Sequence, residues 1–166
     1  MTTYFHVTTA NLRVGSIIER GNFGRLKRLS RHDGSSHGWA VATEIAFEAA
    51  RLKDFSNLPS RLECSFAFLA HADAIRCRDR VCNPGALLYE VALADEGAVL
   101  HIGDFDLLTR CNTPNPAEGY MEMISLAATR YWQGRPGIQT PELLASSGLR
   151  VIRALGWTLL APPANS

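Results

Sequence analysis

The chain has 166 residues and a formal net charge of +1 at pH 7, with 46% hydrophobic and 20% charged residues. This composition is typical of one globular domain, and the small net charge gives no basis for a bulk attraction to nucleic acid or anionic lipid. The first residues lack the features of a signal peptide, and no apolar run approaches the roughly 20 residues of a membrane helix. We therefore expect a single domain over residues 1–166, cytoplasmic or exported without an N-terminal signal, and no membrane partner.

The first third of the chain contains a predicted strand, a predicted loop and a predicted helix. Aromatic and β-branched residues predict a strand over 4–8. Two glycines flank Asn22 in residues 21–25, which predicts a loop, and the polar, basic residues 28–38 predict a further exposed segment. Helical spacing of apolar residues predicts a helix over 43–55.

That first helix has an apolar and a polar side. Thr43 can cap its N-terminus, and Glu48 and Arg51 occupy the polar flank. The apolar residues that recur at helical spacing are Ile45, Ala46, Ala49 and Leu52.

The middle of the chain contains three predicted strands and a short helix. Apolar and polar side chains alternate over residues 62–69, which is the period of a half-buried strand. Residues 71–81 predict a short charged helix. Residues 87–93 and 98–102 predict two further strands with a turn at 95–97.

The C-terminal third contains a second strong helix over 118–132, which glycine and proline at 134–137 end sharply. The next two apolar segments, 142–145 and 149–152, look like a hairpin. Because strands lie at both ends of the chain with helices between them, we expect an α+β fold.

The four cysteines do not indicate a metal site. They contain no C-x-x-C pair, so we predict no structural zinc ion and no other metal. Their spread favours free thiols in a reducing compartment, with two disulfides as the alternative if the protein is exported. The cysteines are Cys64, Cys77, Cys82 and Cys111.

The common catalytic signatures are missing, among them the nucleophile elbow, the P-loop and the dinucleotide-binding glycine motif. Three segments nevertheless resemble, in order and spacing, the motifs of the ADP-ribosyltransferase-like superfamily: His6-Val7-Thr8-Thr9, Ser65-Phe66-Ala67-Phe68 and Pro141-Glu142-Leu143-Leu144. A second resemblance covers nearly the whole chain. It is to a little-characterised bacterial family of single-domain, toxin-like relatives of that superfamily, through residues 4–8, 21–24, 59–62, 88–91 and 131–134.

The resemblance implies split antiparallel β-sheets with flanking helices and an NAD+-binding cleft between the sheets. It implies transfer of ADP-ribose from NAD+, the substrate, to a macromolecular acceptor, with release of nicotinamide, in a toxin or effector setting. A protein side chain is the favoured acceptor. Nucleic acid is the alternative, because the basic residues 25–31 could follow a phosphate backbone and Trp39 could stack on a base. A third hypothesis is a non-catalytic binding module with the same fold.

By resemblance, Glu142 is the catalytic residue, because a carboxylate beside the ribose stabilises the oxocarbenium-like charge that develops there. His6 would then bind ribose hydroxyls. The backbone of Val7 would hold the nicotinamide amide, and Thr8 would add a hydroxyl to the same pocket.

The second motif and two arginines would complete the NAD+ site. Phe66 or Phe68 would stack on the nicotinamide, beside Ser65. Arg25 or Arg61 would bind the pyrophosphate, because a guanidinium fork matches phosphate oxygens.

Each of these roles has a structural alternative. His6 can be a core histidine, and Phe66 and Phe68 can be core side chains. Arg61 can be a surface or ion-paired residue. Glu142, after a proline, also fits the first turn of a helix. The alternative for Tyr131 and Trp132 is that they pack the second helix against the sheet.

Two positions depart from the superfamily patterns. Thr140 stands where many arginine-modifying members carry an acidic residue or glutamine, so we do not favour an arginine acceptor. The second motif lacks the tyrosine of the toxin-like branch, and Ser65 suits the serine-containing branch instead.

Overall fold

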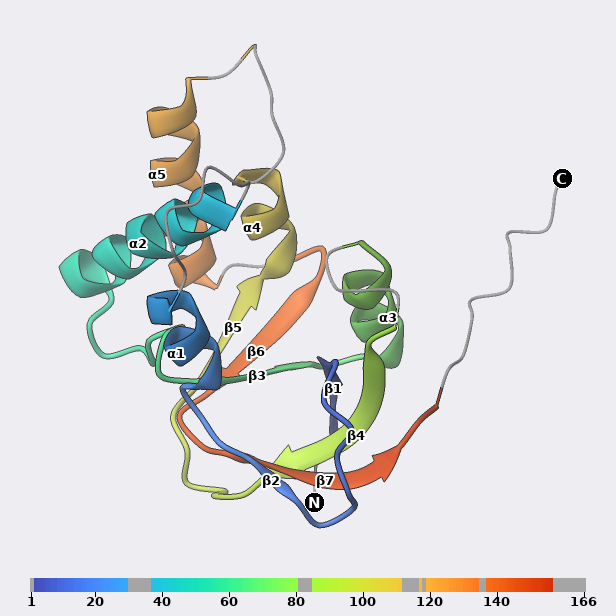
Figure 1. Cartoon of the computed structure of the whole chain (residues 1–166). Helices are drawn as coiled ribbons and strands as arrows, with labels where there is room; N and C mark the ends of the chain where they lie inside the picture. Colours follow the sequence, from blue (N-terminus) through green and yellow to red (C-terminus); the bar gives the residue numbers. More distant parts are fainter. Residues whose placement is uncertain are drawn as a thin grey trace, which may run out of the picture.

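The computed structural model describes residues 2–29, 37–80, 85–111, 117, 119–134 and 137–156. Within them, the chain forms seven strands and five helices, which confirms the expected α+β class (Figure 1). The strands are β1 (Tyr4–Thr8), β2 (Ile17–Ile18), β3 (Ser65–Phe68), β4 (Leu87–Leu93), β5 (Leu100–Asp104), β6 (Pro141–Ala145) and β7 (Leu149–Ala154). The helices are α1 (Asn22–Leu29), α2 (His37–Asp54), α3 (His71–Arg80), α4 (Phe105–Cys111) and α5 (Tyr120–Gln133).

The strands form one antiparallel sheet in the order β2-β7-β4-β1-β3-β6-β5, and the sheet consists of two wings. Inside the first wing, β2-β7-β4-β1, strand β1 pairs with β4 along its whole length. Between the wings, β1 and β3 are in register only at Phe5 and Phe68. The second wing, β3-β6-β5, therefore diverges from the first beyond this point, toward the Thr8 end of β1 and the Ser65 end of β3.

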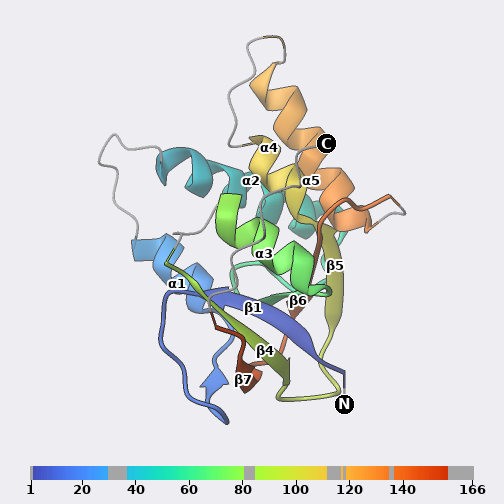
Figure 2. The same cartoon turned by 90° about the vertical axis from the view of Figure 1, so that its right-hand side faces the viewer.

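Three buried clusters hold the wings and helices together. Helices α2, α4 and α5 pack on the second wing, with Phe47, Trp132 and Leu144 in their shared core (Figure 1). A second cluster joins the two wings through Tyr89 and Leu143. Helix α3 covers the junction of β1 and β3 (Figure 2). Helix α3 thus packs on one side of the junction. The ends of β1 and β3 that diverge from each other, at Thr8 and Ser65, lie past the pair Phe5 and Phe68.

The hairpin predicted at the C-terminus is wrong. Strand β6 lies between β3 and β5, and β7 lies between β4 and β2, so the two consecutive strands belong to different wings. Strands β4 and β5, also joined by a short turn, are separated in the same way. Alternation of side chains predicts a strand, but it does not predict which strands become its partners.

The predicted first loop forms the start of α1 instead. Gly21 has a φ of +76°, in the left-handed region that favours glycine, and it precedes the helix. Gly24 lies inside α1 against the backbone of Leu62. The two glycines thus serve helix entry and close packing rather than a turn. Of the predicted loop 28–38, both ends are helical, and residues 30–36 lie outside the described residues.

Replacing Gly24 with alanine tests this close packing. A Cβ at this position would overlap the backbone of Leu62, which cannot move aside as a flexible side chain can. We expect Gly24→Ala to lower the free energy of unfolding by about 1–3 kcal/mol in urea denaturation. Gly38→Ala, in α2 with open space around the new methyl group, is the matched control. A loss in Gly24→Ala no larger than in Gly38→Ala would contradict this account.

Helix α2 begins earlier than predicted and turns its other side to the core. Ile45 and Leu52 are 64% and 61% exposed, whereas Glu44 and Arg51 are buried beside Phe47. The side predicted as the polar flank is therefore the inner side. This is possible because the inward charges have buried partners: Arg51 bonds to a neighbouring carboxylate and two backbone carbonyls, and Glu44 bonds to a buried arginine.

The remaining elements agree with the predictions within a few residues, except that β2 and α4 were not predicted. Helix α4 follows Asp104, whose Oδ1 accepts the N–H of Asp106 at 3.1 Å as a helix cap. Among the described residues, no helix has the length and apolar content needed to cross a membrane.

The three described cysteines, Cys64, Cys77 and Cys111, are buried, and Cys64 and Cys111 are free thiols, in line with the first of the two predicted alternatives. Burial raises the pKa of Cys64 to about 12 and that of Cys111 to about 11. These two thiols are therefore poor nucleophiles at neutral pH. Cys82 lies outside the described residues.

Candidate functional site

A cavity of about 570 Å³ lies where β1 and β3 diverge. Helix α1 and the segment that leads into it form part of its lining, and β6 contributes from the second wing. All the residues to which the resemblance gave a role line this cavity: His6, Val7, Thr8, Arg25, Arg61, Ser65, Phe66, Phe68 and Glu142. The fold thus brings together side chains from segments far apart in the sequence.

His6 links the two wings at this cavity. Its Nδ1 donates a hydrogen bond to the carbonyl oxygen of Phe66 at 2.8 Å. Because a carbonyl only accepts, the proton of the neutral ring lies on Nδ1, and Nε2 is the acceptor nitrogen. Burial lowers the pKa of His6 below its ordinary value, against the opposing effect of the bond to Phe66. At neutral pH His6 is thus an oriented, neutral ring that can accept a hydrogen bond from a hydroxyl group.

Acidification is expected to weaken the fold through His6. Its pKa in the folded state lies below the unfolded value near 6.5, so the unfolded chain takes up this proton first as the pH falls. Stability is therefore present above the unfolded pKa and is lost as the pH falls toward the folded pKa. In urea denaturation at about pH 7.5 and about pH 5, we expect His6→Asn to lose less stability than wild type. Burial also lowers the pKa of His101, so only the difference between the two proteins reports on His6, and equal losses would contradict the prediction.

Glu142 lies on β6 opposite Phe68, and only 3% of its surface is exposed. This strand position rules out the alternative that it belongs to the first turn of a helix. Its Oε2 accepts hydrogen bonds from the Tyr131 hydroxyl at 2.8 Å and from Nη1 of Arg61. Both hydrogen bonds made to this carboxylate by the described residues end on Oε2, which leaves Oε1 to interact with a ligand in the cavity.

Arg61, which is 4% exposed, holds two carboxylates just before β3. Its Nε and Nη2 donate to Glu44 at 2.9 and 3.2 Å, and its Nη1 donates to Glu142 and to the Tyr131 hydroxyl. Burial by itself would lower the pKa of Arg61, but the Glu142 and Glu44 carboxylates hold it well above its ordinary value. Burial raises the pKa of Tyr131 well above its ordinary value, and Glu142 adds to this against the opposing charge of Arg61. The ion-paired alternative for Arg61 is therefore the arrangement observed.

Aromatic rings form a wall of the cavity around Arg61. The rings of Phe66 and Phe23 meet edge to face with centroids 5.1 Å apart, and Cζ of Arg61 lies 4.8 Å over the ring of Phe66. Phe68 is only 5% exposed and packs edge-on against Phe105. Phe66, which is half-buried, is thus the more accessible of the two predicted stacking residues.

The hydroxyl groups of Thr8 and Ser65, two residues of the predicted site, differ in their hydrogen bonding. Oγ1 of Thr8 accepts the N–H of Ala10 at 3.2 Å, in the turn after β1. Oγ of Ser65 is buried and has no hydrogen-bond partner among the described residues. Ser65 therefore contributes to the cavity wall, and its hydroxyl reaches a ligand only if the wall shifts.

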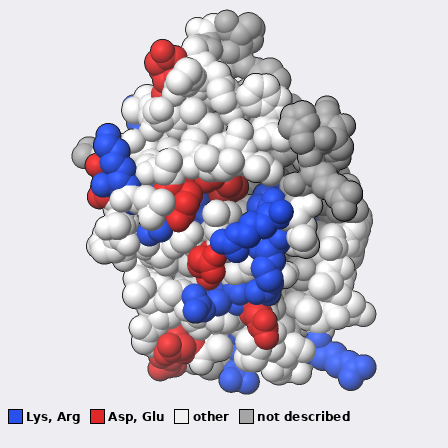
Figure 3. All heavy atoms as spheres, turned by 60° about the vertical axis from the view of Figure 1, so that its left-hand side comes forward, with Lys and Arg blue, Asp and Glu red and all other residues white. Residues whose placement is uncertain are grey.

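Charged side chains of both signs lie at and beside α1, at the outer side of the cavity. On the face shown in Figure 3, lysine and arginine side chains form a connected stretch with acidic side chains along its edges. Arg28 pairs with Glu63 at 2.6 Å and Arg25 approaches Glu19 at 3.8 Å, and all four side chains are more than half exposed. Of the two arginines in the cavity lining, Arg25 is the exposed one.

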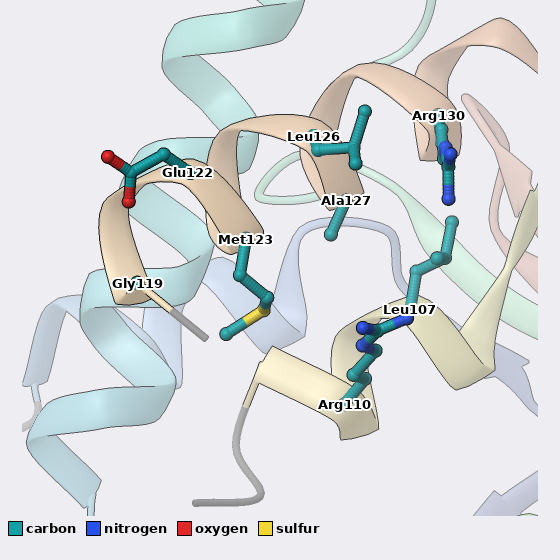
Figure 4. Close-up of a pocket in the computed structure, with 8 residues that line it drawn as sticks. All are labelled: Leu107, Arg110, Gly119, Glu122, Met123, Leu126, Ala127 and Arg130. Carbon is teal, nitrogen blue, oxygen red and sulfur yellow. The ribbon is translucent and has the colours of Figure 1, made fainter. Parts of the chain in front are cut away.

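A second, smaller cavity of about 280 Å³ lies between α4 and α5 (Figure 4). Its lining is apolar at Leu107, Met123 and Leu126, with Arg110 and Arg130 beside them. No buried carboxylate or histidine lines it, so we assign no chemistry to this cavity. Within the described residues, no three His, Cys, Asp or Glu side chains are grouped so that they could hold a metal ion.

Glu44 and Tyr131 belong to the site, although the sequence did not identify them as site residues. Tyr131 packs α5 against the sheet as predicted, but its hydroxyl also bonds to Glu142. The available signal for Glu44 was that Glu44, Glu48 and Arg51 recur at helical spacing along one side of α2. That spacing does not show that this side is buried.

No curated protein matches the chain. A family model matches residues 14–155, which include every element from β2 to β7 and all the cavity residues named above except those on β1. The family is described as "Protein of unknown function (DUF2441)", and this description names no activity. The chain belongs to the DUF2441 family.

Proposed function

We propose that the protein is a mono-ADP-ribosyltransferase that cleaves NAD+ and transfers ADP-ribose to a macromolecular acceptor. The observation that carries the proposal is that the nine residues given a role by the resemblance all line one cavity. The junction of β1 and β3 at a single residue pair supports the split-sheet arrangement that such enzymes use to hold NAD+. The cavity volume of about 570 Å³ is in the range of ordinary ligand sites.

In the proposed reaction, the bond between C1′ of the ribose and the nicotinamide nitrogen breaks, and its electron pair leaves with nicotinamide, which becomes neutral. The ribose then carries an oxocarbenium-like positive charge until a nucleophile of the acceptor bonds to C1′ and loses its proton. A fixed carboxylate beside the ribose stabilises this charge where it develops. Oε1 of Glu142 is suited to this role, because it also can accept a hydrogen bond from a ribose hydroxyl.

The other residues bind and orient NAD+ in this proposal. Neutral His6 accepts a hydrogen bond from a ribose hydroxyl through Nε2, and Phe66 stacks on the nicotinamide ring. Arg25 at the outer side of the cavity pairs with the pyrophosphate. Arg61, whose guanidinium is engaged by two carboxylates, holds Glu142 instead of the pyrophosphate. The wall beside these groups is completed by Val7, Thr8, Ser65 and Phe68.

A protein side chain remains the favoured acceptor. Near the cavity, Glu19 and Glu63 pair with arginines, which offsets part of the positive charge that would attract a nucleic acid. Trp39, the predicted base-stacking residue, is 58% exposed but packs edge-on against Tyr120. Arg31 of the predicted basic segment lies outside the described residues.

Incubation with NAD+ that is labelled in its adenylate moiety, in the presence of a cell lysate, tests the proposal. We expect free nicotinamide and a labelled macromolecule from which protease, but not nuclease, releases the label. Release by nuclease instead would select the nucleic-acid acceptor. Without any nicotinamide release, the enzymatic proposal fails. A rise in melting temperature with millimolar NAD+ would then identify a non-catalytic NAD+-binding module.

A further inference from the structure

A single guanidinium connects α2, β6 and α5 beside the cavity. Arg61 presents its Nε and Nη2 edge to Glu44 at 2.9 and 3.2 Å, and its Nη1 to Glu142 and Tyr131. Because a guanidinium is planar and rigid, an edge that is fixed on one carboxylate sets the direction of the remaining N–H groups. One face of the guanidinium is also fixed, because its Cζ lies 4.8 Å over the Phe66 ring.

The network contains one carboxylate more than charge balance requires. Glu44 and Glu142 carry two formal negative charges and Arg61 carries one positive charge, so one negative charge remains. All three side chains are at most 9% exposed. One carboxylate alone would balance Arg61, and burying a second one is costly. An excess buried charge beside a cavity is therefore a sign of function rather than of stability.

We propose that Glu44 is a positioning residue for Glu142 that acts through Arg61. It holds one edge of the guanidinium, so that Nη1 meets Oε2 of Glu142 and Oε1 is left for the ligand. It also offsets the charge of Arg61, which would otherwise cancel the charge of Glu142. Tyr131 completes the arrangement by donating to the same Oε2 at 2.8 Å. The expected effect of Glu44 on turnover rests on the proposed function, whereas its expected effect on the orientation of Glu142 does not.

The test compares wild type with Glu44→Gln and with the matched control Glu48→Gln. Glu48 lies one turn further along α2, and its half-buried carboxylate bonds to Arg51 and Ser60 rather than to Arg61. The first readout is the ¹³C carboxyl NMR signal of Glu142 in the unliganded protein, assigned by its loss in Glu142→Gln. The second is the kinetics of nicotinamide release. We expect Glu44→Gln to shift the Glu142 signal and to lower kcat about 10- to 100-fold while KM changes less than about threefold. Glu48→Gln is expected to match wild type in both.

Each outcome decides the inference. An unchanged Glu142 signal in Glu44→Gln overturns it, and so does a shifted signal with unchanged kcat. If wild type releases no nicotinamide, the proposed function fails, and the NMR comparison still decides whether Glu44 orients Glu142. If Glu44→Gln does not fold, Glu44→Asp keeps the charge and shortens the side chain by one methylene. Its Glu142 signal is then expected to shift, and an unshifted signal overturns the inference.

Discussion

Replacing Glu142 with glutamine is expected to lower nicotinamide release about 100-fold or more while NAD+ affinity changes little. The amide has nearly the volume of the carboxylate, and its oxygen can still accept hydrogen bonds from Arg61 and Tyr131. What it lacks is the negative charge that stabilises the ribose as nicotinamide departs. Values of kcat and KM from chromatography of nicotinamide, together with NAD+ affinity from calorimetry, measure the two effects separately.

Glu63→Gln is the control for this loss of charge. Glu63 is an exposed carboxylate that pairs with Arg28 near α1, outside the cavity lining. We expect its replacement to leave kcat within about twofold of wild type. Equal turnover by Glu142→Gln and wild type would remove Glu142 from the mechanism.

The largest loss of stability is expected from Arg61→Met. This substitution keeps an apolar side chain of moderate size, but it leaves Glu44 and Glu142 buried without their counter-charge. Removing one partner from a buried ion pair typically costs about 3–5 kcal/mol. Urea denaturation at neutral pH, with circular dichroism as the readout, measures this loss in the free energy of unfolding.

Two further variants separate the charge effect from a general loss of packing. Arg28→Met removes an arginine whose ion pair with Glu63 is exposed, and it is expected to cost less than about 1 kcal/mol because solvent screens the pair. Combining Arg61→Met with Glu44→Gln and Glu142→Gln is expected to recover much of the loss, because no buried charge is then unpaired. A loss in Arg61→Met no greater than in Arg28→Met would contradict the account of this network.

The strands of this protein were predictable from the sequence, but their pairing was not. Residues 87–93 match β4, because apolar and aromatic residues in such a run are typical of a strand. The segments that form β6 and β7 are joined by a turn as short as that of a hairpin, yet they pair in different wings. The continuous apolar run Leu143-Leu144-Ala145 indicates a strand that is buried on both faces. Which strands pair with it depends on contacts between residues that are distant in the sequence.

Part of the lining of the cavity was predictable, but the network of charged residues behind it was not. Short motifs on β1, β3 and β6 were sufficient to select residues that meet in space. For α2 the apolar pattern predicted the wrong inner side, and Ile45 and Leu52 lie exposed. Charged residues take the inner side because Arg61 lies there and bonds to Glu44. No local pattern reveals such a partner, since the two residues belong to different elements.

A crystal structure of the protein with NAD+ bound tests the central claim most directly. We predict that NAD+ occupies the cavity between β1 and β3, with its nicotinamide ring against Phe66. A hydroxyl of the nicotinamide ribose is then within hydrogen-bond distance of Oε1 of Glu142 and Nε2 of His6. NAD+ bound at another site, or in this cavity with that ribose away from Glu142, would contradict the account.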